Sequence, residues 1–289
     1  MKPRLNILVT GANGQLGMEF RSISEQYPAY NFLLVSKDEL PINDRIAVTD
    51  FFSANKISFC INCAAYTAVD KAETEKDMAF DINGYAVGAL AAICKKHAAR
   101  LIHFSTDYVF NGKSSVPYKE TDITDPVNAY GASKLLGEQE AQKHNPDVVI
   151  IRTSWVYSQF GKNFVKTMLR LMNEKENISV VNDQFGCPTY ANDLARTVMK
   201  MISKFENPSP GIYNYCNKGA ISWYEFALAI KEISGSSCKV NPIYTSQYPT
   251  PAKRPKYSVL DTEKISKTFE INIPSWKDSL ETCISKMNK

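Results

Sequence analysis

Short apolar runs alternate with longer amphipathic segments along the first half of the chain. The apolar runs are rich in aliphatic and β-branched residues, which is typical of strands that are buried on both faces of a parallel sheet. They predict strands at residues 5–10, 31–35, 56–62, 100–106 and 147–152. The amphipathic segments predict helices at residues 15–25, 43–56, 78–98 and 130–144. This alternation predicts βαβ units, and we expect an α/β fold with a doubly wound parallel Rossmann sheet.

The alternation becomes less regular after Arg152. A helix is predicted within residues 154–176, a short strand and a helix within 178–202, and a further strand at 211–217. A helix at 222–233 is followed by a loop rich in Pro and Tyr, and a loop of that length inside a compact chain is usually functional. These pieces predict a smaller, discontinuous C-terminal domain.

Composition and charge are those of a soluble globular protein. The 289 residues are 44% hydrophobic and 22% charged, and the net charge of +4 is spread along the chain. This distribution predicts neither a nucleic-acid surface nor a membrane surface. The first apolar run is short and is followed at once by glycines, so we expect no signal peptide, no spanning helix and a cytoplasmic protein.

Seven scattered cysteines argue against a disulfide framework and fit a reducing compartment. Cys60 and Cys63 form a CxxC, but no second CxxC accompanies them. The three histidines, His97, His103 and His144, form no ligand cluster in the sequence. We therefore expect the two cysteines to pack in the core, and we expect no metal site.

A glycine-rich turn joins the first predicted strand to the first predicted helix. Gly11 permits the tight turn, Gly14 lets the backbone approach a pyrophosphate, and Gly17 lets the helix pack closely on the strand. The helix N-terminus attracts the same anion. The turn therefore predicts dinucleotide binding.

The end of the second strand bears on the choice of dinucleotide. An acidic residue there would favour NAD, whereas Ser36 and Lys37 would accept the 2′-phosphate of NADP. Asp38 and Glu39 follow too closely to exclude NAD. We expect NADPH as the cofactor, with NADH as the alternative.

The looser pattern after Arg152 also suggests how the chain divides into domains. We expect a smaller domain that closes over the cofactor. The expected ranges are residues 1–152 plus about 188–216 for an NAD(P)-binding Rossmann domain, and residues 153–187 plus 217–289 for a substrate-binding domain.

Tyr130 and Lys134 lie four residues apart at the start of a predicted helix. This spacing places them on one face, so the ammonium can lie near the phenol. A nearby cation stabilises the phenolate, whose pKa is otherwise about 10, and makes the phenol a usable proton donor near neutral pH. Ser105 and Thr106 end a predicted strand, and their hydroxyls are expected at the carboxyl edge of the sheet, where ligands bind. These four side chains predict one active site.

Further motifs follow in a fixed order over nearly the whole chain. They are GANGQLG, NCAAYTAVDKAE, HFSTDYVFNG, NAYGASKLLGE, IRTSWVYS, GKNFVKTMLRL, VNDQFGCPTYA and PTPAKRPKYSVLDTEK. With these motifs the chain resembles the extended short-chain dehydrogenase/reductase superfamily and, within it, the dTDP-4-dehydrorhamnose reductase family. The resemblance implies an NAD(P)H-dependent oxidoreductase that reduces the 4-keto group of dTDP-4-dehydro-L-rhamnose to dTDP-L-rhamnose. Such an enzyme serves nucleotide-sugar biosynthesis for cell-surface polysaccharide.

The resemblance also implies roles for single residues. Tyr130 is the expected proton donor to the developing alkoxide, Lys134 lowers its pKa and holds the nicotinamide ribose, and Thr106 orients the 4-keto group. The guanidinium of Arg254 is suited to the nucleotide diphosphate. Further expected substrate contacts are Asp107 and Trp155. Cofactor contacts are expected at Gly11, Gly14, Gln15, Leu16, Gly17, Lys37, Ile42, Ala64, Ala65, Tyr66, Thr67, Phe104, Tyr130 and Lys134.

Two positions depart from the family pattern. Pro41 and Ile42 stand where the family usually has Asp followed by Ile or Leu. Proline removes a backbone donor, and the carboxylate is lost, so this departure affects the adenosine side rather than the chemistry. Lys253 stands where the family often has a second Arg, and we expect it to keep the phosphate contact as a point charge.

Other functions are open at this point. A reductase or epimerase of a related nucleotide keto sugar would share Tyr130 and Lys134. A dehydratase of the superfamily needs a Thr-Asp-Glu group, and Tyr108 stands in the place of the Glu, so we do not expect dehydration. One branch of the family is a non-catalytic, cofactor-binding regulatory subunit of methionine adenosyltransferase. Related enzymes can form dimers, sometimes with a divalent ion, so a homodimer is allowed, although no ligands for an ion can be assigned here.

Overall fold

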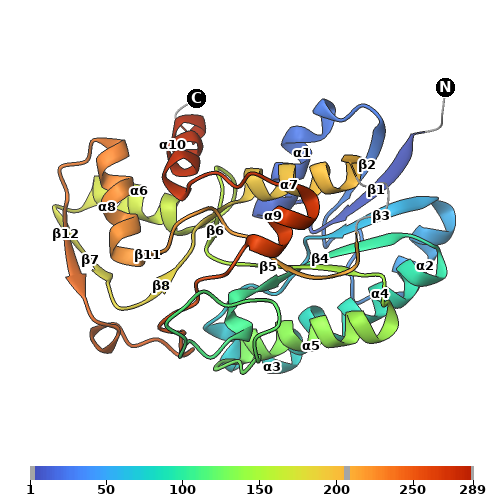
Figure 1. The fold of residues 1–289 in the computed structure, drawn as a ribbon, viewed down its shortest axis with the longest axis horizontal. Helices are drawn as coiled ribbons and strands as arrows, with labels where there is room; N and C mark the ends of the chain where they lie inside the picture. Colours follow the sequence, from blue (N-terminus) through green and yellow to red (C-terminus); the bar gives the residue numbers. More distant parts are fainter. Residues whose placement is uncertain (1–3, 205–208, 288–289) are drawn as a thin grey trace.

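The largest sheet of the computed structural model is parallel and has six strands in the order β10-β5-β4-β3-β1-β2 (Figure 1). The structure describes residues 4–204 and 209–287. β2 and β3 flank β1 on opposite sides, so the carboxyl ends of β1 and β3 border the crevice in which such sheets bind ligands. The expected doubly wound α/β fold is confirmed. The strands are β1 (Leu5–Thr10), β2 (Tyr30–Val35), β3 (Ile57–Asn62), β4 (Arg100–Thr106), β5 (Val149–Thr153) and β10 (Gly211–Asn214).

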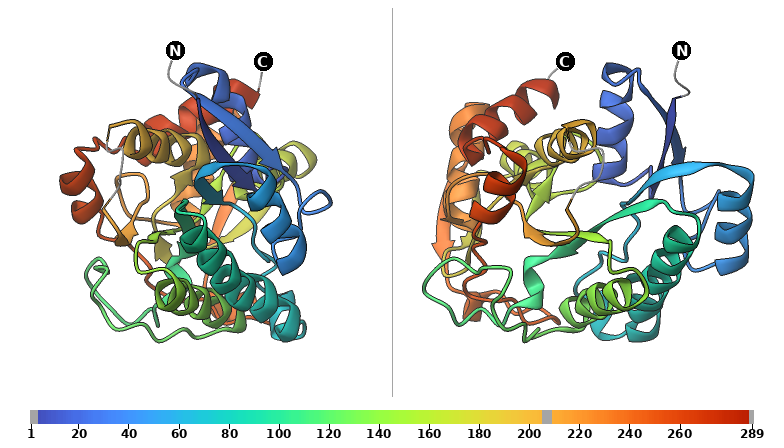
Figure 2. Two further views of the ribbon diagram at one scale, coloured as in Figure 1. Left: turned by 90° about the vertical axis from the view of Figure 1, so that its right-hand side faces the viewer. Right: turned by 45° about the vertical axis from the view of Figure 1, so that its right-hand side comes forward.

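Helices cover both faces of this sheet (Figure 2). Consecutive strand residues point to opposite faces, so Ile7 and Val9 of β1 pack into one core and Leu8 packs into the other. The first core also contains α1 and α7, and the second contains α2, α4 and α5. Burial on both faces explains why the strands are continuous apolar runs in the sequence. The covering helices are α1 (Gln15–Ile23), α2 (Arg45–Ala54), α4 (Ala86–Lys96), α5 (Ala129–His144) and α7 (Ala191–Lys204).

The helix expected at residues 78–98 is interrupted. Its first part, α3 (Lys76–Phe80), is joined to α4 by η3 (Asp81–Tyr85), a π-helical turn. Within this turn the Asn83 carboxamide accepts a hydrogen bond from the Tyr66 N–H at 2.9 Å and donates one to the Tyr66 carbonyl at 3.0 Å. The Asn83 carbonyl oxygen lies against Gly137 of α5. Single π turns of this kind are frequent at functional sites.

A second, smaller body of elements is built around its own hydrophobic core. Val165 of α6, Ile178 of β7 and Phe226 of α8 pack together there with Leu280 of α10. β7 and β12 form a parallel two-stranded sheet on one side of this core. The elements are α6 (Phe164–Glu174), β7 (Asn177–Val181), α8 (Trp223–Ser234), β12 (Lys239–Ile243) and α10 (Trp276–Met287).

Short elements connect the two bodies. Parallel β6 and β9 and antiparallel β8 and β11 form two further two-stranded sheets. The short strands are β6 (Val156–Tyr157), β8 (Phe185–Gly186), β9 (Thr189–Tyr190) and β11 (Ile221–Ser222). Single 3-10 turns are η1 (Ser24–Gln26), η2 (Lys71–Glu73), η4 (Asp107–Val109) and η5 (Thr245–Gln247).

The C-terminal region contains more regular structure than its sequence pattern predicts. The loop expected after α8 includes β12 and α9 (Glu263–Phe269), and α10 follows it. Ile265 and Phe269 of α9 pack into the core of the six-stranded sheet, although their segment falls in the range expected for the substrate-binding domain. Residues 205–208 fall inside the segment expected to return to the Rossmann domain and lie outside the described residues. Within the described ranges, no helix combines the length and the apolarity needed to cross a bilayer.

Candidate active site

The end of β4 and the start of α5 bring three expected catalytic residues into one region. Thr106 is the last residue of β4, and Tyr130 is the second residue of α5. The Asn128 side chain caps α5 by accepting a hydrogen bond from the Gly131 N–H at 2.7 Å, and it donates to the Lys253 carbonyl at 2.8 Å. A side chain at Gly131 would collide with the Tyr108 carbonyl, so only glycine lets α5 approach this closely.

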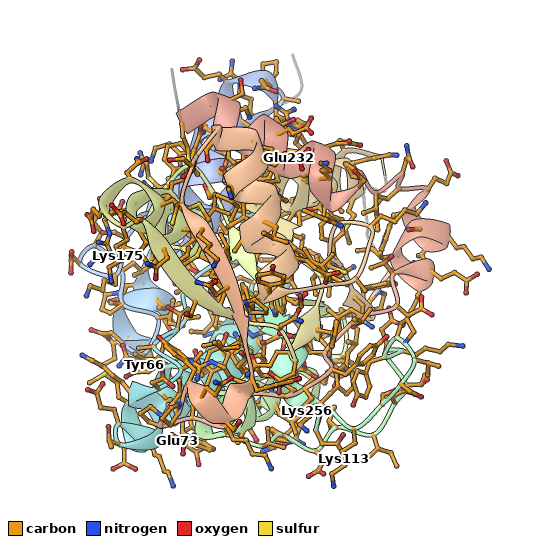
Figure 3. The ribbon with its side chains drawn as sticks, turned by 90° about the vertical axis from the view of Figure 1, so that its left-hand side faces the viewer. Tyr66, Glu73, Lys113, Lys175, Glu232 and Lys256 are labelled. Atoms are coloured by element: carbon orange, nitrogen blue, oxygen red, sulfur yellow. The ribbon has the colours of Figure 1, made fainter. Side chains whose placement is uncertain are left out.

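A carboxylate from a preceding turn also holds the start of α5. Glu73 accepts a hydrogen bond from the Ala129 N–H at 2.8 Å, and Figure 3 shows Glu73 and Tyr66 at the same end of the molecule. An acidic group at a helix N-terminus satisfies a free N–H and is favoured by the helix dipole. Tyr66 and Tyr130 both pack against a small cluster of buried alanines, and the Tyr66 hydroxyl donates to Glu75 at 2.6 Å. Tyr130 is therefore placed by contacts from several segments.

The environment of Tyr130 favours the protonated phenol. Burial raises the pKa of Tyr130 to about 12, and the negative charge of Asp107 acts in the same direction. A hydrogen bond with Thr106 opposes this shift by favouring the phenolate. The phenol therefore carries its proton at neutral pH, as a proton donor must. The pKa lowering expected from Lys134 stays a prediction.

Asp107 is a buried acid directly beside these hydroxyls. Its side chain is 2% exposed, and its Oδ1 accepts a hydrogen bond from the Thr106 hydroxyl at 3.0 Å. Burial raises the pKa of Asp107 to about 7, although hydrogen bonds from Ser258 and Thr106 oppose the shift. This carboxyl group therefore changes its charge close to neutral pH.

Lys134 lies deeper, beneath the carboxyl edge of the sheet. It is 2% exposed, and its Nζ donates to the Phe104 carbonyl at 2.6 Å. His103 Nε2 is 3.4 Å from the same Nζ. Burial lowers the pKa of Lys134 to about 8, and the charge of Glu138 opposes this shift. The structure thus places Lys134 and the expected proton donor, Tyr130, on one helix, with the Lys134 side chain bonded to β4.

A cavity of about 570 Å³ lies at the carboxyl ends of β1, β2 and β3. Six of the expected cofactor contacts line it, namely Gly11, Gly14, Lys37, Ile42, Ala64 and Ala65. Gly11 has a φ of 64°, and a Cβ there would lie 2.6 Å from the Ala64 N, so glycine is needed on both counts. Pro41, the departure from the family pattern, also lines this cavity. The glycine turn, the cavity and the Lys37 cation fit a dinucleotide phosphate.

The acids that follow β2 do not all face this cavity. Glu39 Oε2 accepts a hydrogen bond from the Ser36 N–H at 2.7 Å, and this bond holds the pKa of Glu39 below its usual value. Glu39 therefore bonds to the backbone, whereas Ser36, Lys37 and Asp38 line the cavity.

Some expected cofactor contacts have structural partners elsewhere. Gln15 Oε1 accepts a hydrogen bond from Asn163 at 2.9 Å, and Gly17 packs on the Gly11 carbonyl. The Phe104 carbonyl is the partner of Lys134. Leu16 packs against the core of the sheet, and Thr67 is exposed.

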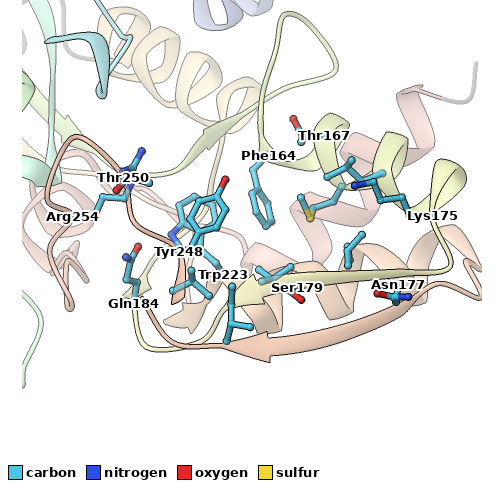
Figure 4. Close-up of a pocket in the computed structure, with 16 residues that line it drawn as sticks. Phe164, Thr167, Lys175, Asn177, Ser179, Gln184, Trp223, Tyr248, Thr250 and Arg254 are labelled. Atoms are coloured by element: carbon cyan, nitrogen blue, oxygen red, sulfur yellow. The ribbon is translucent and has the colours of Figure 1, made fainter. Parts of the chain in front are cut away.

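A second cavity, of about 580 Å³, lies in the smaller body (Figure 4). The rings of Phe164, Trp223 and Tyr248 line it, with Arg254 toward one end and Lys175 toward the other. Sequence reasoning identified only Arg254 among these five. The clearest signal for the others was the Tyr-rich loop that supplies Tyr248.

Trp155 and Arg254, the two expected substrate contacts of this region, are each fixed in place by neighbouring side chains. Trp155 stacks on Trp223 with 3.5 Å between ring centroids and 9° between planes, and it has a φ of 48°. Gly186 makes room for its indole, because a Cβ there would lie 2.6 Å from the Trp155 ring. Arg254 forms a bidentate pair with Asp70, at 3.0 Å from Nη1 to Oδ1 and 2.9 Å from Nη2 to Oδ2. Asp70 is a site residue that the sequence did not reveal.

The cysteines carry no sign of metal chemistry. All seven are free thiols, with Cys60 buried and Cys63 partly buried, and burial raises the pKa of Cys63. Among residues 4–204 and 209–287, no group of three or more His, Cys, Asp or Glu side chains is arranged to hold a metal ion.

Comparison with known proteins gives consistent matches over nearly the whole chain. Residues 5–289 match the family model described as RmlD substrate binding domain. The chain is 40% identical to the dTDP-4-dehydrorhamnose reductase of Burkholderia thailandensis, over 97% of this chain and 98% of that protein. It is 43% identical to the spore coat polysaccharide biosynthesis protein SpsK of Bacillus subtilis, over 95% of each chain.

Solved structures of similar proteins superpose closely. A dTDP-4-dehydrorhamnose reductase from Clostridium acetobutylicum has a TM-score of 0.93 and 40% identity, and the match covers 99% of this chain and 100% of that one. The enzyme of the same name from Bacillus anthracis, solved in complex with NADP, has a TM-score of 0.93 and 37% identity, with 98% of this chain and 100% of that chain covered.

Proposed function

Because the chain belongs to the dTDP-4-dehydrorhamnose reductase family, we propose that it reduces the 4-keto group of dTDP-4-dehydro-L-rhamnose to dTDP-L-rhamnose with NADPH. One observation carries this proposal: Thr106, Tyr130 and Lys134 lie between segments that line the two cavities. Asn83 bonds both to the backbone of Tyr66, which follows the cofactor-cavity residue Ala65, and to Ser133, which lies one turn after Tyr130 on α5. The rings of Tyr130 and Tyr108 are nearly perpendicular, with 6.0 Å between their centroids. Tyr108 is close enough to Arg254 of the second cavity for the two to interact electrostatically.

NADPH supplies the hydride when it is bound. We propose that Tyr130 donates its phenolic proton to the sugar O4 as negative charge develops there, while the Thr106 hydroxyl orients the keto group. The ammonium of Lys134 stabilises the phenolate that remains and holds the nicotinamide ribose. The raised pKa of Tyr130 supports its role as the proton donor in this direction of the reaction.

We propose NADPH over NADH on the residues that follow β2. Lys37 offers a cation to a 2′-phosphate, and Glu39, which would repel it, is turned onto the Ser36 N–H. Gly11, Gly14, Ala64 and Ala65 would hold the rest of the dinucleotide. Gln15, Leu16, Gly17, Ile42, Tyr66, Thr67 and Phe104 are proposed contacts as well.

The second cavity is proposed to hold the dTDP part of the substrate. Its three aromatic rings suit a pyrimidine base, and Arg254 suits the diphosphate. Asp70 binds the Nη1 and Nη2 end of the guanidinium, and the edge formed by Nε and the outer N–H of Nη2 is the one proposed to bind a phosphate. Asp107 and Trp155 are proposed substrate contacts on the sugar side.

The domain division stays a proposal that the two separate cores support. In it, residues 1–152 plus about 188–216 bind the cofactor, and residues 153–187 plus 217–289 bind the sugar nucleotide. The packing of α9 on the large sheet assigns residues 263–269 to the first body by contact. A homodimer and a cytoplasmic location are further predictions from the sequence.

The similarity to SpsK favours a second candidate within the same chemistry. That protein's name refers to spore coat polysaccharide, so a reductase for a related nucleotide keto sugar is the alternative. The same catalytic group would serve both substrates, and the difference would lie in the sugar contacts.

The test is the oxidation of NADPH by the purified full chain when dTDP-4-dehydro-L-rhamnose is added, with NADH in parallel. We expect one NADPH consumed for each dTDP-L-rhamnose formed, and slower turnover with NADH. An epimerase would convert the sugar without net cofactor consumption. If NADPH binds but neither cofactor is consumed, the proposal is wrong for this sugar, and the assay is repeated with other dTDP keto sugars.

A further inference from the structure

Three polar side chains form a row across the large sheet beneath Lys134. Thr10 is the register partner of Asn62, and Asn62 is the register partner of His103, so the three lie side by side on β1, β3 and β4. All are inaccessible to solvent, with exposures of 1%, 1% and 0%. Buried polar groups at such a place must satisfy one another, because water cannot reach them.

Two neighbouring donors fix the orientation of the Asn62 carboxamide. Its Oδ1 accepts a hydrogen bond from the Thr10 hydroxyl at 2.7 Å and one from the Ala64 N–H at 3.2 Å. A backbone N–H can only donate, so the oxygen of the carboxamide must face Ala64. The Nδ2 group then faces His103 Nδ1, which lies 3.1 Å away.

The orientation of Asn62 in turn fixes the tautomer of His103. Asn62 Nδ2 donates, so Nδ1 of the imidazole accepts, and the single proton of the neutral ring lies on Nε2. That Nε2–H points toward Lys134 Nζ at 3.4 Å, which is the longest contact of the row. An ammonium has no lone pair to accept this proton, whereas a neutral amine has one. The contact therefore favours the uncharged form of Lys134.

We propose that His103, held by Asn62 as the Nε2–H tautomer, is a positioning residue that opposes the protonation of Lys134. This inference rests on the proposed reductase function, in which Lys134 acts as a cation. The row then sets the pH above which the Tyr130 and Lys134 pair loses its positive charge. It also connects that charge to the glycine turn, because Thr10 directly precedes Gly11.

Few other charges face Lys134. Glu138, on the next turn of α5, favours the ammonium, and this carboxylate is itself paired with Arg152 of β5 at 2.6 Å. Tyr130 lies one turn before it on the same helix. Burial and the charge of Lys134 both lower the pKa of His103 well below its usual value, so the imidazole stays neutral. These directions agree with the neutral imidazole that the tautomer assignment requires.

The direct test is nitrogen NMR of the full-length protein labelled with ¹⁵N in its histidines. The three signals belong to His97, His103 and His144, and that of His103 is identified by its loss in H103N. We expect a neutral Nε2–H ring that does not titrate between about pH 5 and about pH 9. A ring protonated at Nδ1, or one that titrates in this range, overturns the proposal. This readout needs no keto sugar, so it stands apart from the test of the reductase activity.

The functional test compares the pH dependence of wild type, H103N and a control. An Asn side chain at position 103 keeps an oxygen near the place of Nδ1 for Asn62 and removes the N–H that faces Lys134. We expect the alkaline limb of kcat/KM, and the pH above which NADPH affinity falls, to move up by about one pH unit in H103N. H144N changes a surface ring 3.3 Å from Glu140 and should match wild type. Unchanged limbs in H103N overturn the proposal.

A second variant keeps the test open if H103N fails to fold. In N62D the carboxylate accepts a hydrogen bond from Nδ1–H, so the His103 proton is expected to move from Nε2 to Nδ1. The alkaline limb should again move up, because Nε2 then accepts a hydrogen bond from the ammonium of Lys134. Retention of the Nε2–H tautomer in N62D contradicts the proposed control by Asn62.

Discussion

At the scale of single residues, burial raises the pKa of both Tyr130 and Asp107, but the two groups end in different protonation states near neutral pH. It raises both pKa values, to about 12 for the phenol and about 7 for the carboxyl group. Tyr130 therefore stays protonated throughout the physiological range, whereas Asp107 titrates within it. Thr106 contacts both groups and couples the proton donor to a charge that depends on pH.

Replacing Tyr130 with Phe removes the proposed proton donor and leaves the ring in place. We expect kcat to fall by a factor of about 10² to 10⁴, which is the usual contribution of general acid catalysis. NADPH affinity, measured by fluorescence titration, should change much less. Tyr85→Phe, at a side chain that is 61% exposed, is the matched control. Near-normal turnover by Tyr130→Phe would remove this residue from the mechanism.

The pKa of Asp107 predicts a pH dependence of stability. The value rises from 3.8 to about 7 on folding, so the folded state binds this proton more tightly than the unfolded chain does. Stability should therefore decrease as the pH rises from about 4 to about 7, and this contribution should be level above that range. Asp107→Asn removes this dependence.

Thermal unfolding at about pH 5 and about pH 8 checks this expectation. The melting temperature of Asp107→Asn, relative to wild type, should be higher at the alkaline pH than at the acidic one. Asp147→Asn, at a surface acid whose pKa is lowered by Lys95, should not show this change. If the melting temperature of Asp107→Asn differs from that of wild type by the same amount at both pH values, Asp107 is charged in the folded protein at both.

Sequence reasoning identified the residues whose chemistry depends on fixed spacing. Tyr130 and Lys134 belong to one helical turn, and Thr106 ends a recognisable strand. Trp223 and Asp70 were not identified, because their roles arise from long-range partners. Trp223 meets Trp155, and Asp70 meets Arg254, which lies 184 positions away along the chain.

At the scale of elements, α5 shows why its motif was more informative than its hydrophobic pattern. The buried face of this helix is built from small and polar residues rather than an apolar stripe. Gly131 and Gly137 permit close approach, and Lys134 and Glu138 carry buried charges. Because the backbone of this helix lies in contact with neighbouring segments, adding a single methyl group at Gly131 or Gly137 would cause a collision.

Gly137→Ala tests this close packing. In an exposed helix, alanine is more stabilising than glycine by about 1 kcal/mol, so helix propensity alone predicts that the variant is more stable. Here the added Cβ would collide with the Asn83 carbonyl, and we expect a loss of about 2 kcal/mol of unfolding free energy. Urea denaturation measures the difference. Gln139→Ala, on the exposed face of the same helix, is the control. Stabilisation by Gly137→Ala would show that α5 and η3 are free to separate.

The elements that the sequence pattern did not predict each have a physical reason. β12 contains Asn241 and Pro242 and pairs with one neighbour, β7, so it lacks the apolar run of a central strand. α9 is only seven residues long, too short for a clear helical period. The π turn at Asp81–Tyr85 depends on hydrogen bonds to Tyr66 and Ser133, which no local pattern contains.

At the scale of the whole molecule, polar contacts join the two bodies. Glu19 of α1 is fully buried and accepts hydrogen bonds from Ser158 at 2.6 Å and Asn192 at 2.8 Å. The ion pair between Asp70 and Arg254 connects the loop after β12 with the segment that follows β3 of the large sheet. Buried and partly buried polar contacts of this kind fix relative orientation more than they add stability.

Asp70→Asn should weaken sugar-nucleotide binding rather than the chemical step. The bidentate pair holds the guanidinium in place, and its loss lets Arg254 sample other orientations. We expect KM for the dTDP sugar to rise about tenfold, with kcat and NADPH affinity within about twofold of wild type. Steady-state kinetics measure all three. A fall in kcat with unchanged KM would instead place Asp70 in the proton-transfer step.

The last strand of the large sheet has a consequence for synthesis of the protein. β10 is translated about sixty residues after β5, yet it pairs with β5 from Val149 to Arg152. Until the ribosome has released residues 211–214, β5 is an open edge made of residues that are all buried in the finished protein. Such an edge is a template for intermolecular pairing. The nascent chain therefore presents this otherwise buried strand for intermolecular pairing until β10 completes the sheet.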